Sequence, residues 1–188
     1  MKFSNRRLLL ASASPRRREL LTGVVLFDCI PSVFSECAEG LSQREMALFN
    51  AKGKAEEVFF RYPDRVVLGA DTVVGLNGEI FLKPKDEADA RRMLRTLSGQ
   101  THAVITGVCI KWAEGEQLFA EETLVTFETL NEDLISRYLE SGLYLGKAGA
   151  YGIQDGFPLV KEIKGSYTNV VGLPMEQVQK ALTEVGLC

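Results

Sequence analysis

Short apolar runs alternate with amphipathic segments along this chain, and that alternation constrains the fold more than any other feature of the sequence. The run Leu8–Ala11 predicts a short buried strand, and the segment from Ser14 to Thr22 predicts a helix. Ser14 can cap this helix, Pro15 suits its first turn, and Gly23 can end it. A strand, a polar loop and a helix in this order are typical of an α/β protein.

The same alternation continues along the chain and predicts a single domain over residues 1–188, with a mixed sheet and helices on both sides. Ser42 and Glu45 form a capping box at the start of a helix, and Asn77-Gly78 predicts a hairpin turn. The apolar run 66–70 ends on Asp71, so we expect this carboxylate beside a strand end. The other predicted strands are 25–30, 73–76, 79–82, 102–112, 117–127 and 159–164, and the other predicted helices are 42–62, 86–98, 131–141 and the segment that Pro174 opens.

Charge and hydrophobicity argue against several classes of protein. The net charge of −3 disfavours a general nucleic-acid coat, because binding to a phosphate backbone needs a large basic face. No apolar run approaches the ~20 residues that span a bilayer, and Met1–Leu10 lacks the apolar core of a signal peptide. We therefore expect a cytoplasmic protein that binds neither nucleic acid nor membrane.

The cysteines and the single histidine do not suggest a zinc site or a histidine-based triad. Cys29, Cys37, Cys109 and Cys188 are scattered and form no C-x-x-C pair, so we expect reduced and mostly buried thiols. His102 stands alone at the start of a predicted strand, which favours a structural or surface role.

Three consecutive arginines, Arg16 to Arg18, stand where the first helix begins. The amino end of a helix already carries partial positive charge, so an exposed arginine there is unfavourable by about 0.3–1 kcal/mol. The run is either a solvated helix face or a group that faces a negatively charged ligand.

Three further features each have an ordinary interpretation and a functional one. Asp71 at the end of an apolar strand lies where catalytic groups collect in α/β sheets. Lys83 is either a loop charge or a ligand contact. The segment Gly146–Gln154 is either a flexible loop or one whose small residues let the backbone approach a ligand, and it matches neither a P-loop nor a dinucleotide motif.

The combination of these features suits a nucleoside triphosphate, which needs fixed cations, backbone N–H groups and carboxylates for a divalent metal. Hydrolysis of a phosphoanhydride needs charge neutralisation, in-line positioning and an activated water. The candidate cations are Arg16, Arg17, Lys54 and Lys83, the N–H groups lie at Ser14 and the helix head, and the candidate ligands of Mg²⁺ or Mn²⁺ are Glu36 and Asp71.

Six short motifs occur in order between Leu8 and about Leu182, namely LLLASASPRRRELL, LGADTVV, LKPKD, LSGQTHAVITGV, KAGAYGIQ and GSYTNVVGLP. In order and spacing they resemble the Maf family of nucleoside-triphosphate pyrophosphatases. The resemblance implies a mixed, curved sheet with flanking helices and two lobes around a nucleotide-binding cleft, a Maf/ITPase-like fold. It also implies hydrolysis to a monophosphate and pyrophosphate, and a homodimer.

The resemblance further implies roles for individual residues. It places the general base on Asp71 and the selection of the nucleotide on Arg16, Thr72 and Gln154. Whether Asp71 acts as the base or as a metal ligand stays open from the sequence. The other expected substrate-binding residues are Ser12, Ser14, Arg17, Lys54 and Lys83, and the expected metal ligands are Glu36 and Asp71.

The loop Ala148–Gln154 resembles the branch of the family that acts on dTTP and UTP. Gln154 offers a donor and an acceptor together, which suits the N3–H and carbonyl edge of thymine or uracil and not cytosine. Gly146 stands where that branch usually has an aspartate. A carboxylate there either helps to bind metal or orient the loop, in which case activity is weakened here, or only caps the loop.

Two other interpretations of the same pocket stay open at the level of sequence. The chain could be a nucleotide-binding regulatory module of cell division with little turnover, or a pyrophosphatase with another base preference such as 7-methyl-GTP. A nucleic-acid-processing role is opposed by the negative net charge and by the lack of an aromatic stacking platform.

Overall fold

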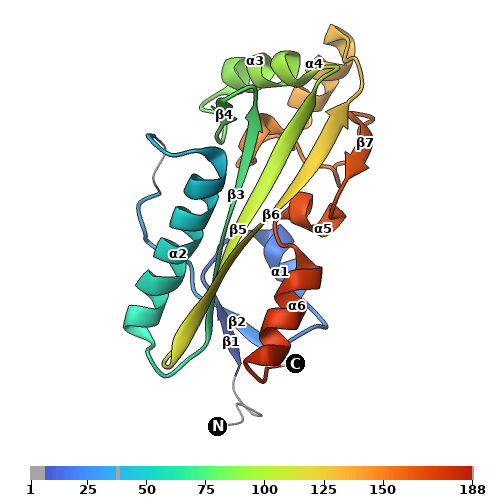
Figure 1. Cartoon of the computed structure of the whole chain (residues 1–188). Coiled ribbons are helices and arrows are strands. Elements are labelled where there is room, and N and C mark those ends of the chain that lie inside the picture. Colours follow the sequence, from blue (N-terminus) through green and yellow to red (C-terminus); the bar gives the residue numbers. More distant parts are fainter. Residues whose placement is uncertain (1–6, 37–38, 188) are drawn as a thin grey trace.

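The computed structural model describes residues 7–36 and 39–187, which contain a seven-stranded mixed sheet with helices on both faces (Figure 1). This arrangement confirms the predicted fold class. The strands are β1 (Leu8–Leu10), β2 (Phe27–Cys29), β3 (Val67–Leu76), β4 (Glu79–Phe81), β5 (Thr101–Trp112), β6 (Gly115–Phe127) and β7 (Val160–Lys164). The helices are α1 (Pro15–Leu21), α2 (Gln43–Arg61), α3 (Glu87–Leu97), α4 (Glu132–Glu140), α5 (Tyr167–Val171) and α6 (Met175–Glu184), and a 3₁₀ turn covers Ala148–Ala150.

The sheet combines a parallel part and an antiparallel part. Its order is β2-β1-β3-β5-β6-β7, with β4 paired to the C-terminal end of β3. β1 runs parallel to β2 and β3, whereas β3, β5, β6 and β7 alternate in direction. The long strands β3, β5 and β6 twist as they cross the molecule from one end to the other (Figure 1). These three strands therefore connect the two ends.

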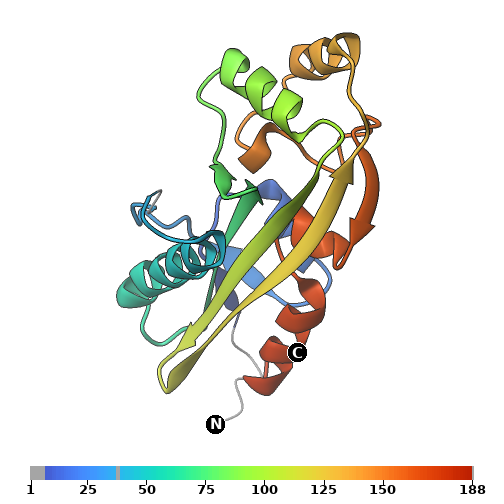
Figure 2. The same ribbon diagram turned by 45° about the horizontal axis from the view of Figure 1, so that its top comes forward.

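Separate groups of core residues at the two ends agree with the expected two lobes. One group packs under α3 and α4 and includes Phe81, Leu94 and Tyr138. Another packs between the sheet and the helices α1 and α6, and includes Leu10 and Leu182. Figure 2 shows α3 and α4 at one end of the molecule and α6 toward the other.

Helix α2 lies unusually close to the sheet because two glycines face it. A Cβ at Gly69 in β3 would overlap the carbonyl oxygen of Ala51, and a Cβ at Gly107 in β5 would overlap that of Ala47. Glycine at these two positions lets the helix backbone rest directly on the strands. The polar side chains on this part of α2 are thereby brought within reach of β3.

The local signals in the sequence are confirmed where they are strongest. Ser42 and Glu45 form the capping box of α2, with each side chain bonded to the backbone of the other. Asn77 and Gly78 adopt positive φ values of 52° and 85° in the turn between β3 and β4. Cys109 is buried and Cys29 half-buried, both as free thiols, while Cys37 and Cys188 lie outside the described residues.

The structure corrects the sequence-based prediction in three places. β3 continues without a break through Asp71, which pairs with Gly107 of β5, so Asp71 is not beside the end of its own strand. The connection between the predicted strands 102–112 and 117–127 is shorter than expected, because β6 already begins at Gly115. Helix α5, capped by Ser166, was not predicted because it is only five residues long.

No helix in the described ranges is long and apolar enough to cross a membrane.

Candidate active site

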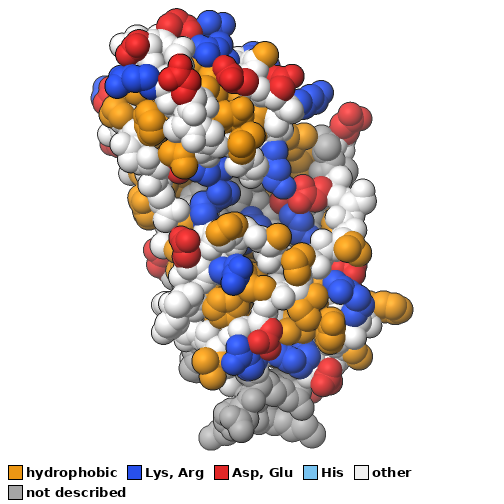
Figure 3. Space-filling model, turned by 180° about the vertical axis from the view of Figure 1, so that it is seen from behind, with side chains coloured by type: hydrophobic (Ala, Val, Ile, Leu, Met, Phe, Trp, Pro, Cys, Tyr) orange, Lys and Arg blue, Asp and Glu red, His pale blue; other side chains and the backbone are white. Residues whose placement is uncertain are grey.

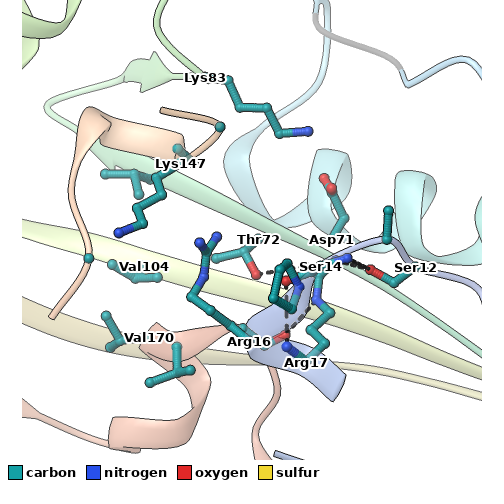
Figure 4. A pocket seen from close by; sticks show the side chains of 18 of the residues that line it. Ser12, Ser14, Arg16, Arg17, Asp71, Thr72, Lys83, Val104, Lys147 and Val170 are labelled. Atoms are coloured by element: carbon teal, nitrogen blue, oxygen red, sulfur yellow. Dashed lines mark hydrogen bonds between the residues drawn. The ribbon is translucent and has the colours of Figure 1, made fainter. Parts of the chain in front are cut away.

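The candidate site lies where one edge of β3 has no partner strand among the residues that the structure describes. β1 pairs with β3 as far as Leu68, and β4 pairs with the same edge from Val74 onward. Asp71 and Thr72 lie on the open stretch between these pairings. Neighbouring residues of a strand face opposite sides of a sheet, but at this open edge both line one cavity of about 540 Å³. The loop after β1 and the segment 145–154 help to enclose that cavity (Figure 4).

Helix α2 holds both carboxylate oxygens of Asp71. Lys54 Nζ donates to Oδ1 at 2.7 Å, and Asn50 Nδ2 donates to Oδ2 at 3.0 Å. Asn50 and Lys54 are one helical turn apart and therefore reach the same neighbour. Asp71 is only 8% exposed. Its carboxylate is thus oriented by the protein before any ligand binds.

Lys54 also connects Asp71 to a second carboxylate. Its Nζ lies 2.7 Å from Glu36 Oε1 as well as 2.7 Å from Asp71 Oδ1. Burial raises the pKa of Glu36, but the hydrogen bond and the charge of Lys54 outweigh burial and hold that pKa below its ordinary value. Lys83, whose side chain is 62% exposed, lies 4.0 Å from the same oxygen of Glu36. Negative and positive groups therefore alternate from the pocket floor to its rim.

Arg17 is buried, and its guanidinium is largely occupied by the protein. Nε donates to the carbonyl oxygen of Gly172 at 2.9 Å, Nη1 to Ser12 Oγ at 3.3 Å and Nη2 to Thr72 Oγ1 at 3.0 Å. Burial lowers the pKa of Arg17, and the negative charges of Asp71 and Glu36 partly oppose that effect. Arg17 therefore ties α1, β3 and the end of α5 together beneath the pocket.

The neighbouring Arg16 is placed differently. It is half-buried, lines the cavity, and has no hydrogen-bond or ion-pair partner among residues 7–36 and 39–187. Ser14 caps α1 by accepting from Arg17 N at 3.4 Å, and Ser12 Oγ accepts from Ser14 N at 3.2 Å. Arg18 is exposed and does not line this cavity. Of the three arginines, Arg16 is the one free to meet a ligand.

The opposite half of the cavity has apolar walls. Val104 of β5 and Val74 of β3 are buried there, and Figure 4 shows Val104 and Val170 on the side away from Asp71. Gln154, an exposed residue of the loop, also lines the cavity. We call Ser12, Arg16, Glu36, Lys54, Asp71 and Lys83 the charged half of the pocket, and Val74, Val104, Tyr151, Ile153, Gln154 and Val170 the apolar half.

Thr72 stands between the two halves and is already part of a hydrogen-bond chain. Thr106 Oγ1 donates to the carbonyl oxygen of Asn169 at 3.0 Å and lies 2.9 Å from Thr72 Oγ1. A hydroxyl has one proton, so Thr72 donates to Thr106 while it accepts from Arg17. Thr72 therefore has acceptor capacity, and no donor, left for a ligand.

Tyr151 in the wall of the apolar half is supported from behind by His102. His102 Nε2 lies 2.7 Å from Tyr151 Oη, and both side chains are buried against Phe127. Burial lowers the pKa of His102 to about 4, so the ring is neutral near pH 7. This arrangement agrees with the structural role that the sequence favoured for the lone histidine.

Sequence reasoning did not find two groups that the structure adds to the site. Asn50 was not predicted, although its spacing of four from Lys54 on a helix is a signal that could have pointed to it. Lys147 and Asp155 form an ion pair of 2.5 Å beside the apolar half. Lys147 belongs to the motif KAGAYGIQ, but its partner Asp155 lies just outside that motif.

The acidic residues suit a divalent cation that arrives together with phosphate. No group of three or more His, Cys, Asp or Glu side chains that could hold a metal occurs within the described ranges. Glu36 and Asp71 nonetheless both lie 2.7 Å from Lys54 Nζ, so two carboxylates meet in one region of the pocket. Mg²⁺ commonly binds through one or two carboxylates and takes its other ligands from water and substrate phosphates. The donor set therefore fits such a cation.

The fold and the pocket define a class of protein: an α/β protein whose pocket combines a charged half, which suits phosphate, with an apolar half. Residues 7–185 match the family described as Maf-like protein, and the chain belongs to that family.

Individual relatives cover nearly the whole chain. A protein of Thermococcus kodakarensis named dTTP/UTP pyrophosphatase is 49% identical over 182 residues, which are 95% of this chain and 96% of that protein. A protein of Symbiobacterium thermophilum with the same name is 43% identical over 182 residues, which are 95% of this chain and 94% of that protein. The solved structure of the Staphylococcus aureus Ham1 protein has a similar fold, with a TM-score of 0.55 and 13% sequence identity over 95% of this chain and 99% of that chain.

Proposed function

We propose that this protein is a cytoplasmic nucleoside-triphosphate pyrophosphatase that hydrolyses dTTP and UTP to the monophosphate and pyrophosphate. The observation that carries the proposal is the division of the pocket. Its charged half holds an oriented Asp71 and an Arg16 that has no partner within the described ranges, and its other half holds Gln154 and apolar walls. The relatives named dTTP/UTP pyrophosphatase support the same substrates.

In this proposal the charged half binds the triphosphate and the reacting water. Arg16 and Lys83 contact phosphate oxygens, because Arg16 has no partner among the described residues and Lys83 is mostly exposed at the rim. Ser12 and Ser14 line the same side and offer hydroxyl groups. Charge-assisted hydrogen bonds of this kind are the strong ones. Arg17 contributes mainly by holding Ser12 and Thr72 in place.

Asp71 is the proposed general base. Its two oxygens accept one hydrogen bond each from Lys54 and Asn50, which leaves acceptor capacity for a water molecule. The water attacks the α-phosphorus, its proton passes to Asp71, and the bond to the bridging oxygen breaks so that pyrophosphate leaves. When bound, Mg²⁺ or Mn²⁺ would be held by Asp71 and Glu36, would neutralise phosphate charge and would lower the pKa of bound water.

The apolar half accommodates the base. Val104 and Val170 offer apolar contacts to the ring, and Gln154 offers a donor and an acceptor to the N3–H and carbonyl edge of thymine or uracil. A site that relies on such hydrogen bonds rejects a base that leaves its polar groups unpaired. We therefore expect poor activity on CTP.

A panel of nucleoside triphosphates tests the proposal. The protein is incubated with dTTP, UTP, CTP, GTP or 7-methyl-GTP and Mg²⁺ or Mn²⁺, and monophosphate, pyrophosphate and orthophosphate are measured. We expect pyrophosphate from dTTP and UTP, with a higher kcat/KM than for the other three. Release of orthophosphate would contradict the reaction, and preference for 7-methyl-GTP would contradict the substrate. The Gln154→Ala variant should lose part of the preference for UTP over CTP.

A further inference from the structure

A buried ion pair lies beside the apolar half and has no part in the proposed function. Lys147 Nζ lies 2.5 Å and 2.6 Å from the two carboxylate oxygens of Asp155. Tyr138 Oη donates to Asp155 Oδ2 at 2.6 Å and accepts from Gly152 N at 3.2 Å. The side chains of Lys147 and Asp155 are only 10% and 9% exposed. The pair is therefore anchored to α4 and to the loop that carries Gln154.

Space for this pair depends on Gly152. A Cβ at Gly152 would lie 2.8 Å from both Lys147 Nζ and Asp155 Oδ1, closer than real Cβ contacts come. The ammonium group is thus pressed against the loop backbone only two residues before Gln154. Asp155 follows Gln154 directly, so the pair also fixes the loop backbone from which the Gln154 side chain projects.

Burial of such a pair needs an explanation other than stability. The free energy needed to remove two charges from water is about as large as the free energy gained from their attraction. A buried pair can therefore often be replaced by apolar residues without loss of stability. An ammonium group has three N–H donors, and Asp155 accepts two of them. Lys147 lines the cavity, and Figure 4 shows its side chain reaching into it near Val104, away from Asp71. Among the described residues Asp155 is the acceptor that Lys147 Nζ has, which leaves one N–H without an assigned partner beside the apolar half.

We propose that Lys147 is a specificity-determining residue that donates this third N–H to the O4 carbonyl oxygen of thymine or uracil. The inference rests on the proposed function. Gln154 then accepts from N3–H and donates to O2, and the two side chains together match the whole hydrogen-bonding edge of the base. Cytosine carries an amino group in place of O4, and an ammonium group has no acceptor to offer it. Lys147 thus favours dTTP and UTP and rejects CTP.

The primary experiment compares kcat/KM for UTP and CTP in the wild-type protein and in the double variant Lys147→Met, Asp155→Asn. The second substitution avoids a buried carboxylate without a cation, and its amide oxygen can still accept from Tyr138 Oη. We expect kcat/KM for UTP to fall by roughly ten- to a hundredfold while that for CTP changes little, since a hydrogen bond to a charged group is lost with UTP only. Lys180→Met, at an exposed position of α6, is the control and should leave the UTP/CTP ratio unchanged.

A substrate with one altered atom tests the contact without relying on how the variant folds. Sulfur accepts hydrogen bonds more weakly than oxygen, so the wild-type protein should lose activity on 4-thio-UTP relative to UTP. The double variant should show little further loss from that sulfur atom. Equal losses on UTP and CTP in the double variant, or the same 4-thio penalty with and without Lys147, would overturn the inference. Failure of the wild-type protein on both dTTP and UTP would instead overturn the proposed function.

Discussion

The two halves of the pocket are prepared for a ligand in different ways. In the charged half, Lys54 already joins Asp71 to Glu36, so most groups face their opposite charges before substrate arrives. In the apolar half, buried valines and Tyr151 form the walls, and the ion pair of Lys147 with Asp155 anchors the loop that carries Gln154. Figure 3, a view of the molecule from behind, shows lysine and arginine side chains gathered around a hollow between apolar areas.

This difference separates two kinds of contribution to activity. Groups held in position at the reacting atoms lower the barrier because they need no reorganisation during the reaction. Walls and hydrogen-bonding groups around the base distinguish one substrate from another and act mainly through binding. Substitution of Asp71, which lies at the reacting atoms, should therefore change kcat, and substitution of the phosphate-binding cations should change KM. Substitutions in the apolar half should change the ranking of substrates.

The largest effect is expected for Asp71→Asn. This variant keeps the size of the side chain and removes the proton acceptor, so kcat should fall by about 10²- to 10⁴-fold while triphosphate binding persists. Steady-state kinetics with UTP and a separate measurement of binding check this, with Asp133→Asn on the exposed surface of α4 as the control. A near-normal kcat would place the base on another residue.

A smaller effect is expected when the two cations proposed to bind phosphate, Arg16 and Lys83, are removed. Arg16→Ala and Lys83→Ala should each raise KM for UTP by roughly 10- to 100-fold, because each removes a charge-assisted contact worth about 1.5–3 kcal/mol. Arg18→Ala is the matched control, since Arg18 is exposed and does not line the cavity. An unchanged KM in both pocket variants would exclude these cations from phosphate binding.

Acid should weaken the support of the apolar half through His102. Burial lowers its pKa from 6.5 to about 4, so the unfolded chain takes up the proton first as the pH falls. This contribution to stability is complete above about pH 6.5 and is lost as the pH falls toward 4. The free energy of unfolding should therefore drop by about 2 kcal/mol between pH 7.5 and pH 5, where most carboxyl groups are still ionised.

Urea unfolding at the two pH values measures this drop. The variant His102→Gln lacks the titrating ring and keeps a polar partner for Tyr151, so its stability should decline less over the same interval. An equal decline in the variant would assign the pH dependence to other groups.

The smallest effect is expected at Gly146, the position where the resemblance to the dTTP and UTP branch led us to expect aspartate. Gly146 has a φ of +70° and is exposed, and a Cβ there would meet nothing within 4 Å. Aspartate tolerates this backbone conformation, so Gly146→Asp should lower the free energy of unfolding by at most about 1 kcal/mol. Gly146→Val, which is β-branched, should cost more, about 1–2 kcal/mol. Urea unfolding checks both variants, and a rise in activity with aspartate would show that the carboxylate acts in the site.

Much of the fold could be predicted because its signals are local. The capping box at Ser42, the turn at Asn77-Gly78 and the cap at Ser14 each depend on residues within a few positions, and all three are confirmed. The break expected at Asp71 was wrong because a polar residue inside an apolar run suggests a strand end. The partner that keeps this residue in the strand, Gly107, is distant in the sequence.

Sequence alone indicated most of the residue types in the site, though not Asn50 or the pair of Lys147 and Asp155, since spacing and motifs are properties of the chain itself. Only the tertiary structure decided which partner each charged side chain has. Arg16 and Arg17 are neighbours of the same chemistry, yet Arg17 is occupied by Ser12, Thr72 and Gly172 while Arg16 faces the cavity. The reason is physical: the pairing of a side chain depends on the distance and register between elements far apart in sequence, and those are set when the sheet and helices pack together.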